Sequence, residues 1–141
     1  MVKRTVLIVD DEPDLLTILS KGVAAAGYPV LTANNGKECI DVALKQCPDL
    51  ILLDIDMPEF DGTETLSILK STEATKDIPV IMLTAYTEED YIMESILSGA
   101  TGYLVKPYNH VYLIKRIKRT LEVAYGADEI VLPDTTRSIT G

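Results

Sequence analysis

Leu50-Ile51-Leu52-Leu53-Asp54 is the stretch of sequence that decides the fold, because its four consecutive apolar residues end at a carboxylate. Short apolar runs of this kind, separated by segments with helical periodicity, are typical of strands buried on both faces of a parallel sheet. The carboxyl ends of parallel strands meet at one edge of the sheet. Asp54 is therefore predicted to lie where residues distant in sequence come together.

The same pattern recurs along the chain. Four further strand-like runs are Thr5 to Val9, Val30 to Ala33, Val80 to Thr84 and Tyr103 to Val105. They alternate with helix-like segments, which are Pro13 to Ala26, Gly36 to Gln46, Thr63 to Lys70, Glu88 to Ser98 and Asn109 to Tyr125. This alternation predicts an α/β fold with a single doubly wound, five-stranded parallel sheet and five helices, of the flavodoxin-like type.

Apolar residues at helical spacing indicate which face of each helix is buried. They are Leu15, Leu16, Leu19 and Val23 in the first helix, Ile40, Ala43 and Leu44 in the second, and Ile114, Ile117 and Leu121 in the fifth. We expect these faces to pack on the sheet.

One domain accounts for residues 1–126, and residues 127–141 are expected to form a tail or the start of a linker. The length of 141 residues leaves room for a single domain with a substantial core. The helical periodicity stops at Gly126, and the residues after it are mainly polar apart from Ile130-Val131-Leu132. We expect the fold to end with the fifth helix.

The charge of the chain limits its partners. A net charge of -9 and a pI near 4.5 argue against direct contact with nucleic acid, because phosphate contacts need a basic surface. The first apolar run meets Asp10 after only a few residues and so predicts neither a signal peptide nor a membrane span. Cys39 and Cys47 have no CxxC spacing, which favours two reduced, buried thiols in a cytoplasmic protein.

Acids and one lysine stand at the ends of three apolar runs. Asp10-Asp11 follows Val9, Asp54 ends the central run, and Lys106 follows Val105. Three carboxylates at one edge repel one another and raise their own pKa values, so the cluster needs a cation. Oxygen ligands suit Mg²⁺, and a nearby lysine suits a phosphoryl group. The Asp10-Asp11 pair can also favour the start of the helix at Pro13.

Several motifs occur together in one order: Val9-Asp10-Asp11-Glu12, Asp54-Ile55-Asp56-Met57-Pro58 with Asp61-Gly62, Thr84-Ala85, and Tyr103-Leu104-Val105-Lys106-Pro107. In these motifs the chain resembles the response-regulator receiver domain of two-component signalling over nearly its whole length. The resemblance implies that Asp54 is the phosphoacceptor, which takes a phosphoryl group from a sensor histidine kinase or a histidine phosphotransfer protein. The protein would then be a signalling phosphoacceptor rather than an enzyme that turns over a substrate.

The resemblance also assigns the metal and phosphoryl ligands. Asp11 and Asp54 would bind Mg²⁺ directly, Asp10 would hold a metal-bound water, and the backbone carbonyl of Asp56 would supply a further oxygen. Three groups would hold phosphoryl oxygens: the Lys106 ammonium, the Thr84 hydroxyl and the Ala85 backbone N–H. The Lys106-Pro107 bond is expected to be cis, and the Pro58, Asp61 and Gly62 residues are expected to shape the turn after Asp54.

Thr84 and Tyr103 would form the switch, with the fourth helix, fifth strand and fifth helix as the face that signals. The partner would be an output protein or an effector domain missing from this chain, and a homodimer that forms on phosphorylation is a further option. Gly99-Ala100-Thr101-Gly102 departs from the acidic pair found in regulators that dimerise on this face to bind DNA. This departure counts against the DNA-binding dimer geometry, and the Gly-Ala-x-Gly-Tyr pattern more closely resembles stand-alone chemotaxis-type regulators and receivers fused to varied outputs.

Two other functions fit parts of the sequence. A haloacid-dehalogenase-like phosphatase would use Asp54 and Asp56 as its hydrophobic-DxD motif, but in that family the DxD opens the fold, whereas here Asp10-Asp11 comes first. A flavodoxin-like cofactor-binding module shares the fold class, but the loops lack a phosphate cradle rich in Ser, Thr and Gly. The order and content of the motifs favour the receiver domain.

Overall fold

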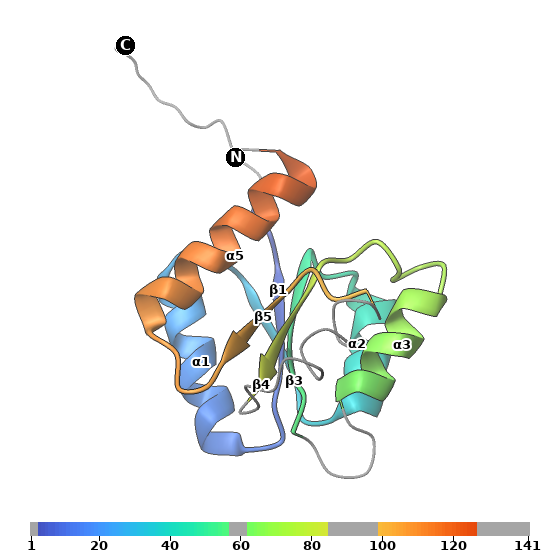
Figure 1. Cartoon of the computed structure of the whole chain (residues 1–141), viewed down its shortest axis with the longest axis horizontal. Helices are drawn as coiled ribbons and strands as arrows, with labels where there is room; N and C mark the ends of the chain where they lie inside the picture. The colour runs from blue at the N-terminus through green and yellow to red at the C-terminus, as the bar shows by residue number, and fades with distance from the viewer. Residues whose placement is uncertain (1–2, 57–61, 85–98, 127–141) are drawn as a thin grey trace.

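The five predicted strands form one parallel sheet in the order β2-β1-β3-β4-β5 (Figure 1). Their bounds are β1 Val6–Val9, β2 Val30–Ala33, β3 Leu50–Asp54, β4 Val80–Thr84 and β5 Gly102–Val105. The computed structural model describes residues 3–56, 62–84 and 99–126. Within these residues the doubly wound α/β architecture is confirmed, and β5 is an edge strand that pairs with β4.

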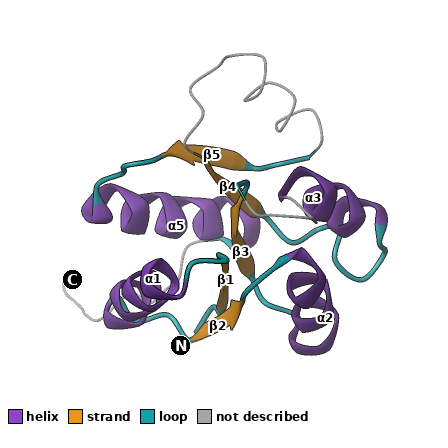
Figure 2. Cartoon of the chain, turned by 90° about the horizontal axis from the view of Figure 1, so that it is seen from below, coloured by secondary structure: helices purple, strands orange, loops and turns teal. Residues whose placement is uncertain are grey.

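Helices cover both faces of the sheet. Figure 2 shows α1 (Pro13–Ala25) and α5 (His110–Tyr125) on one face, with α2 (Gly36–Gln46) and α3 (Gly62–Ser71) on the other. The helix predicted for Glu88 to Ser98 lies outside the described residues. Among the residues that are described, no helix has both the length and the apolar character that a bilayer span would need.

Each strand contributes to two separate cores because successive side chains point to opposite faces. On β1, Leu7 and Val9 belong to the cluster beneath α2 and α3, whereas Val6 and Ile8 belong to the cluster beneath α1 and α5. The whole of β3 is buried. The central strands are therefore anchored from both sides, and their carboxyl ends are held in a fixed register.

The predicted helical faces are mostly right, with corrections at several positions. Leu15 and Leu44 are 38% and 44% exposed, although both were expected to face the core. Cys39 is the buried apolar residue on α2 that the prediction of its face left out, and Leu113 is fully buried on α5, whereas Ile114 is only partly so. Apolar spacing indicates the side of a helix that faces the sheet, but the burial of each residue also depends on the neighbours that the helix contacts.

The two cysteines have opposite environments. Cys39 is buried, and burial raises the pKa of its thiol to about 12. Cys47 is exposed at the end of α2, where its φ of 49° is left-handed. Both thiols are free, as predicted, but the expected burial of Cys47 is wrong, because this residue is the left-handed cap at the end of α2 and its side chain is exposed.

Candidate functional site

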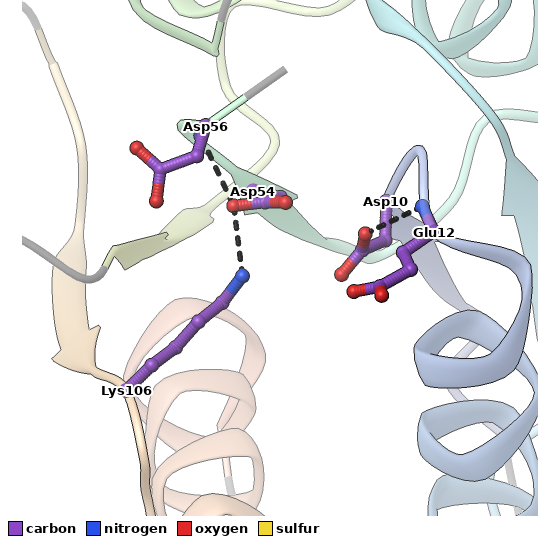
Figure 3. Close-up of polar contacts among 5 residues, drawn as sticks. All are labelled: Asp10, Glu12, Asp54, Asp56 and Lys106. Carbon is purple, nitrogen blue, oxygen red and sulfur yellow. Dashed lines mark hydrogen bonds and ion pairs between the residues drawn. The ribbon is translucent and has the colours of Figure 1, made fainter.

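The acids predicted for the site meet at the carboxyl edge of the sheet. Val9 on β1 pairs with Leu53 on β3, so the next residues, Asp10 and Asp54, lie side by side (Figure 3). One carboxylate oxygen from each of Asp10, Asp11 and Asp54 lies within 4.8 Å of the other two. Asp10 and Asp54 are only 1% and 2% exposed, whereas Asp11 faces solvent. The site therefore has two buried acids, and solvent reaches it at Asp11.

Oδ1 of Asp54 is held by two hydrogen bonds from described residues. This oxygen accepts hydrogen bonds from the Lys106 ammonium at 3.1 Å and from the Asp56 backbone N–H at 3.1 Å. The other oxygen points toward Asp10 (Figure 3). Lys106 reaches the site because β5 ends at Val105, and its backbone N–H then donates to the Thr84 carbonyl at 2.7 Å. The predicted meeting of Asp54 with Lys106 is confirmed.

Asp10 carries a charge that its surroundings only partly stabilise. Its Oδ1 accepts the Glu12 backbone N–H at 2.9 Å, at the start of α1, while its buried Oδ2 has no hydrogen-bond partner among the described residues. The pKa of this carboxyl is raised to about 6, chiefly by burial and also by the Asp54 charge, while the Glu12 hydrogen bond acts in the opposite direction. One lysine does not balance three acids, so the donor set fits a hard divalent cation with oxygen ligands, such as Mg²⁺.

Tyr108 is a residue near the site that the sequence analysis missed. Burial, followed by the negative charges of Asp10 and Asp54, raises the pKa of its phenol to about 12. The hydroxyl is therefore neutral beside the acids. The sequence signal that could have identified Tyr108 is its position two residues after Lys106. The bond between Lys106 and Pro107 is cis, as predicted.

The remaining predicted residues lie around this cluster. Thr84 ends β4 and is buried, in a strand that pairs with β3 through Leu83 and Asp54. Tyr103 is partly buried on β5 and packs against the core beneath α2 and α3. The side chain of Asp56 is exposed and points away from Asp10 (Figure 3). Ala85 and the turn residues Pro58 and Asp61 lie outside the described residues.

Gly62 is required by close packing behind the site. A Cβ at this position would come within 2.6 Å of the Asp54 carbonyl oxygen and 2.7 Å of the Ile55 Cα. The Gly62 N–H donates to the Ile55 carbonyl at 3.2 Å. The start of α3 is thereby fixed against the backbone that carries Asp54, in keeping with the turn role predicted for Gly62.

The family model described as the response regulator receiver domain matches residues 6–118. The chain belongs to this family. The phosphate regulon transcriptional regulatory protein PhoB of Pseudomonas aeruginosa is 41% identical over 121 residues, which are 86% of this chain and 53% of that protein. A histidine kinase of Formosa agariphila is 39% identical over 120 residues, which are 85% of this chain and 9% of the kinase. The match lends no support to a haloacid-dehalogenase-like phosphatase.

Solved structures agree with this assignment. The chemotaxis protein CheY4 of Vibrio cholerae superposes with a TM-score of 0.80 at 36% identity, over 84% of this chain and 98% of that one. The chain thus spans nearly all of a solved receiver protein but about half the length of the PhoB relative. The receiver domain is therefore the part shared with proteins of different overall size.

Proposed function

We propose that Asp54 is the phosphoacceptor of this receiver domain. One of its carboxylate oxygens attacks the phosphorus of a phosphohistidine on a sensor kinase or phosphotransfer protein, the phosphorus–nitrogen bond breaks, and the histidine nitrogen leaves with the electron pair. The product is an acyl phosphate on Asp54. The observation that carries the proposal is the position of Asp54, which is buried beside Asp10 and bound to Lys106 at 3.1 Å.

Three groups of the chain would hold the phosphoryl oxygens. The Lys106 ammonium already contacts Asp54 and would bond a phosphoryl oxygen added there. Thr84 is the last residue of β4, the neighbour of β3, and Ala85 is the next residue in the sequence; the Thr84 hydroxyl and the Ala85 backbone N–H would bond the other oxygens. Phosphoryl transfer needs mainly alignment and charge neutralisation, which fixed donors supply without reorganisation.

Asp10, Asp11, Asp54 and the backbone carbonyl of Asp56 would hold Mg²⁺. The buried Oδ2 of Asp10, which has no hydrogen-bond partner in the described part of the chain, and the close approach of the three carboxylates support this assignment. When bound, the cation neutralises charge on the transferring phosphoryl group. Asp10 Oδ1 accepts the Glu12 N–H, and Oδ2, which has no partner among residues 3–56, 62–84 and 99–126, would hold a metal-bound water.

The signal would leave through the face that includes β5 and α5, with Thr84 and Tyr103 as the switch. We place the receiver in residues 1–126 and the tail or linker in residues 127–141, in a cytoplasmic protein whose only reactions are its own phosphorylation and dephosphorylation. A transcription factor and a histidine kinase both contain a related domain, so the output depends on what accompanies it. A homodimer formed on phosphorylation is the simplest output that needs no further domain.

Intact mass after incubation with acetyl phosphate and Mg²⁺ tests the assignment. The parent should gain one phosphoryl group, and Asp54→Asn should gain none. Asp49→Asn is the matched control, because it removes a partly buried acid from the opposite edge of the sheet and should leave the adduct unchanged. An adduct that persists in Asp54→Asn, or that forms equally well in EDTA, would contradict the proposal.

A further inference from the structure

Arg116 of α5 lies directly on the edge strand β5. Its Nη1 is 3.5 Å from the Tyr103 carbonyl oxygen, to which it donates, and its guanidinium carbon is 6.0 Å from the centre of the Tyr112 ring. Its Nη2 occupies the space where a side chain at Gly102 would begin, since a Cβ built there would overlap it. The guanidinium therefore rests on the backbone at the start of β5.

This contact sets Arg116 apart from the other cations of α5. Lys115, Lys118 and Arg119 are exposed, whereas Arg116 is partly buried and Gly102 beneath it is fully buried. Gly102 does not have a positive φ, so its backbone conformation does not demand glycine. A side chain at this position would meet the Arg116 guanidinium, which would have to move away from β5.

The contact joins α5 to the reacting end of the sheet. β5 pairs with β4 on one side only, so as an edge strand it is less constrained than β1 or β3. Lys106 follows β5 directly and binds Asp54. A continuous path therefore runs from Asp54 through Lys106 and β5 to the guanidinium of Arg116.

We propose that Arg116 is a positioning residue that clasps α5 to β5 and carries a displacement of Lys106 to α5. The inference rests on the proposed function, because the displacement arises when Lys106 shifts its bond from Asp54 to an added phosphoryl group. The clasp makes β5 and α5 move as one element. The clasp depends on packing and on a hydrogen bond. A positive charge at position 116 without these contacts would not couple α5 to β5.

Amide NMR spectra of the whole chain, recorded with and without Mg²⁺ and beryllofluoride as a phosphoryl analogue, test the clasp. The Ile55 and Lys106 amides report binding at Asp54, and the Lys118 and Leu121 amides report the response of α5. Two variants break the contact in different ways: Arg116→Ala removes the guanidinium, and Gly102→Ala displaces it while the charge remains. Arg119→Ala, one turn further along α5, is the matched loss of an exposed charge.

The clasp predicts that both contact-breaking variants keep the shifts at Ile55 and Lys106 but lose most of the shift on α5. We expect about a fivefold reduction, which corresponds to a weak coupling between sites. Arg119→Ala should respond like the parent. A full α5 shift in Gly102→Ala or Arg116→Ala, or an equal loss in Arg119→Ala, would overturn the clasp. A parent without shifts at Ile55 and Lys106 would instead overturn the phosphoacceptor assignment on which the clasp rests.

Discussion

The acids at the two edges of the sheet differ in how well their carboxylates are paired. At the amino edge, Asp49 accepts the Thr5 N–H on Oδ2 at 2.7 Å, and its Oδ1 lies 3.6 Å from the Arg4 guanidinium. The Tyr125 hydroxyl donates to the Asp49 carbonyl at 2.8 Å, and Arg4 covers the Tyr125 ring at 4.4 Å. Both oxygens of the Asp49 side chain therefore have a partner from another element.

At the carboxyl edge, the acids outnumber their partners. Asp10 has one buried oxygen without a hydrogen bond among the described residues, and its pKa is raised to about 6 chiefly by burial. Lys106 is the cation bound to Asp54. A paired acid stabilises the fold, whereas a crowded one costs stability until a ligand arrives. We infer that the amino edge serves the fold and that the carboxyl edge serves binding, and the following predictions test this difference.

The largest expected effect is a gain in stability from Asp10→Asn. In the parent without metal, the ionised Asp10 is buried, so its replacement by a neutral amide of the same shape should raise the free energy of unfolding by roughly 2 kcal/mol at pH 7. Urea unfolding in EDTA measures it. A variant less stable than the parent at pH 7 would show that this edge is not destabilised by charge.

The gain should depend on pH in a defined direction. Because the pKa of Asp10 is raised from 3.8 to about 6 in the folded protein, its stabilising contribution is fully present below pH 3.8 and is lost as the pH rises to about 6. The advantage of Asp10→Asn over the parent should therefore be absent below about pH 4, grow up to about pH 6 and then level off. An advantage that is constant from pH 4 to pH 7 would point to packing instead.

Next in size is the effect of Mg²⁺ on the parent. At a concentration ten times the dissociation constant, a ligand specific for the folded state adds about 1.4 kcal/mol to the free energy of unfolding. The melting temperature should rise accordingly, and it should rise much less in Asp11→Ala. Asp49→Ala is the control at the other edge and should keep the full rise. An equal rise in Asp11→Ala would mean that the metal binds elsewhere.

At the amino edge, replacing the acid should lower the free energy of unfolding instead of raising it. Asp49→Ala removes the acceptor of the Thr5 N–H and the partner of Arg4, so the free energy of unfolding should fall by about 1 kcal/mol, a value limited by the partial exposure of both side chains. Urea unfolding beside Asp10→Asn gives the direct contrast. If both substitutions change stability in the same direction, the distinction between the two edges is wrong.

The smallest expected effect is that of Tyr125→Phe. The variant loses the hydrogen bond to the Asp49 carbonyl but keeps the ring beneath Arg4, so we expect a loss of about 0.5 kcal/mol. Arg4→Ala should cost a similar amount, and the double variant should show less than the sum if the two residues act together. Fully additive losses would show that Arg4 and Tyr125 contribute independently.

Much of the fold could be predicted because its signals are local. The apolar runs of β1, β3 and β4 and the glycine after α1 mark element ends without reference to the rest of the chain. The exposure of Leu15, Leu44 and Cys47 could not be predicted in the same way. Periodicity indicates which side of a helix faces the sheet, but how deep each residue lies depends on how the helix sits on its neighbours.

The sequence by itself determined that the acids and the lysine stand at the carboxyl ends of predicted strands. Because these ends meet at one edge of a parallel sheet, the sequence also determined that the residues would share that edge. Only the tertiary structure decided that one Asp10 oxygen has no partner among the residues that are described, that Tyr108 lies near the acids, and that Arg116 contacts Gly102. The physical reason is that residue type and spacing set local conformation and burial pattern. The pKa values and hydrogen-bond partners depend on contacts between segments that the sequence separates.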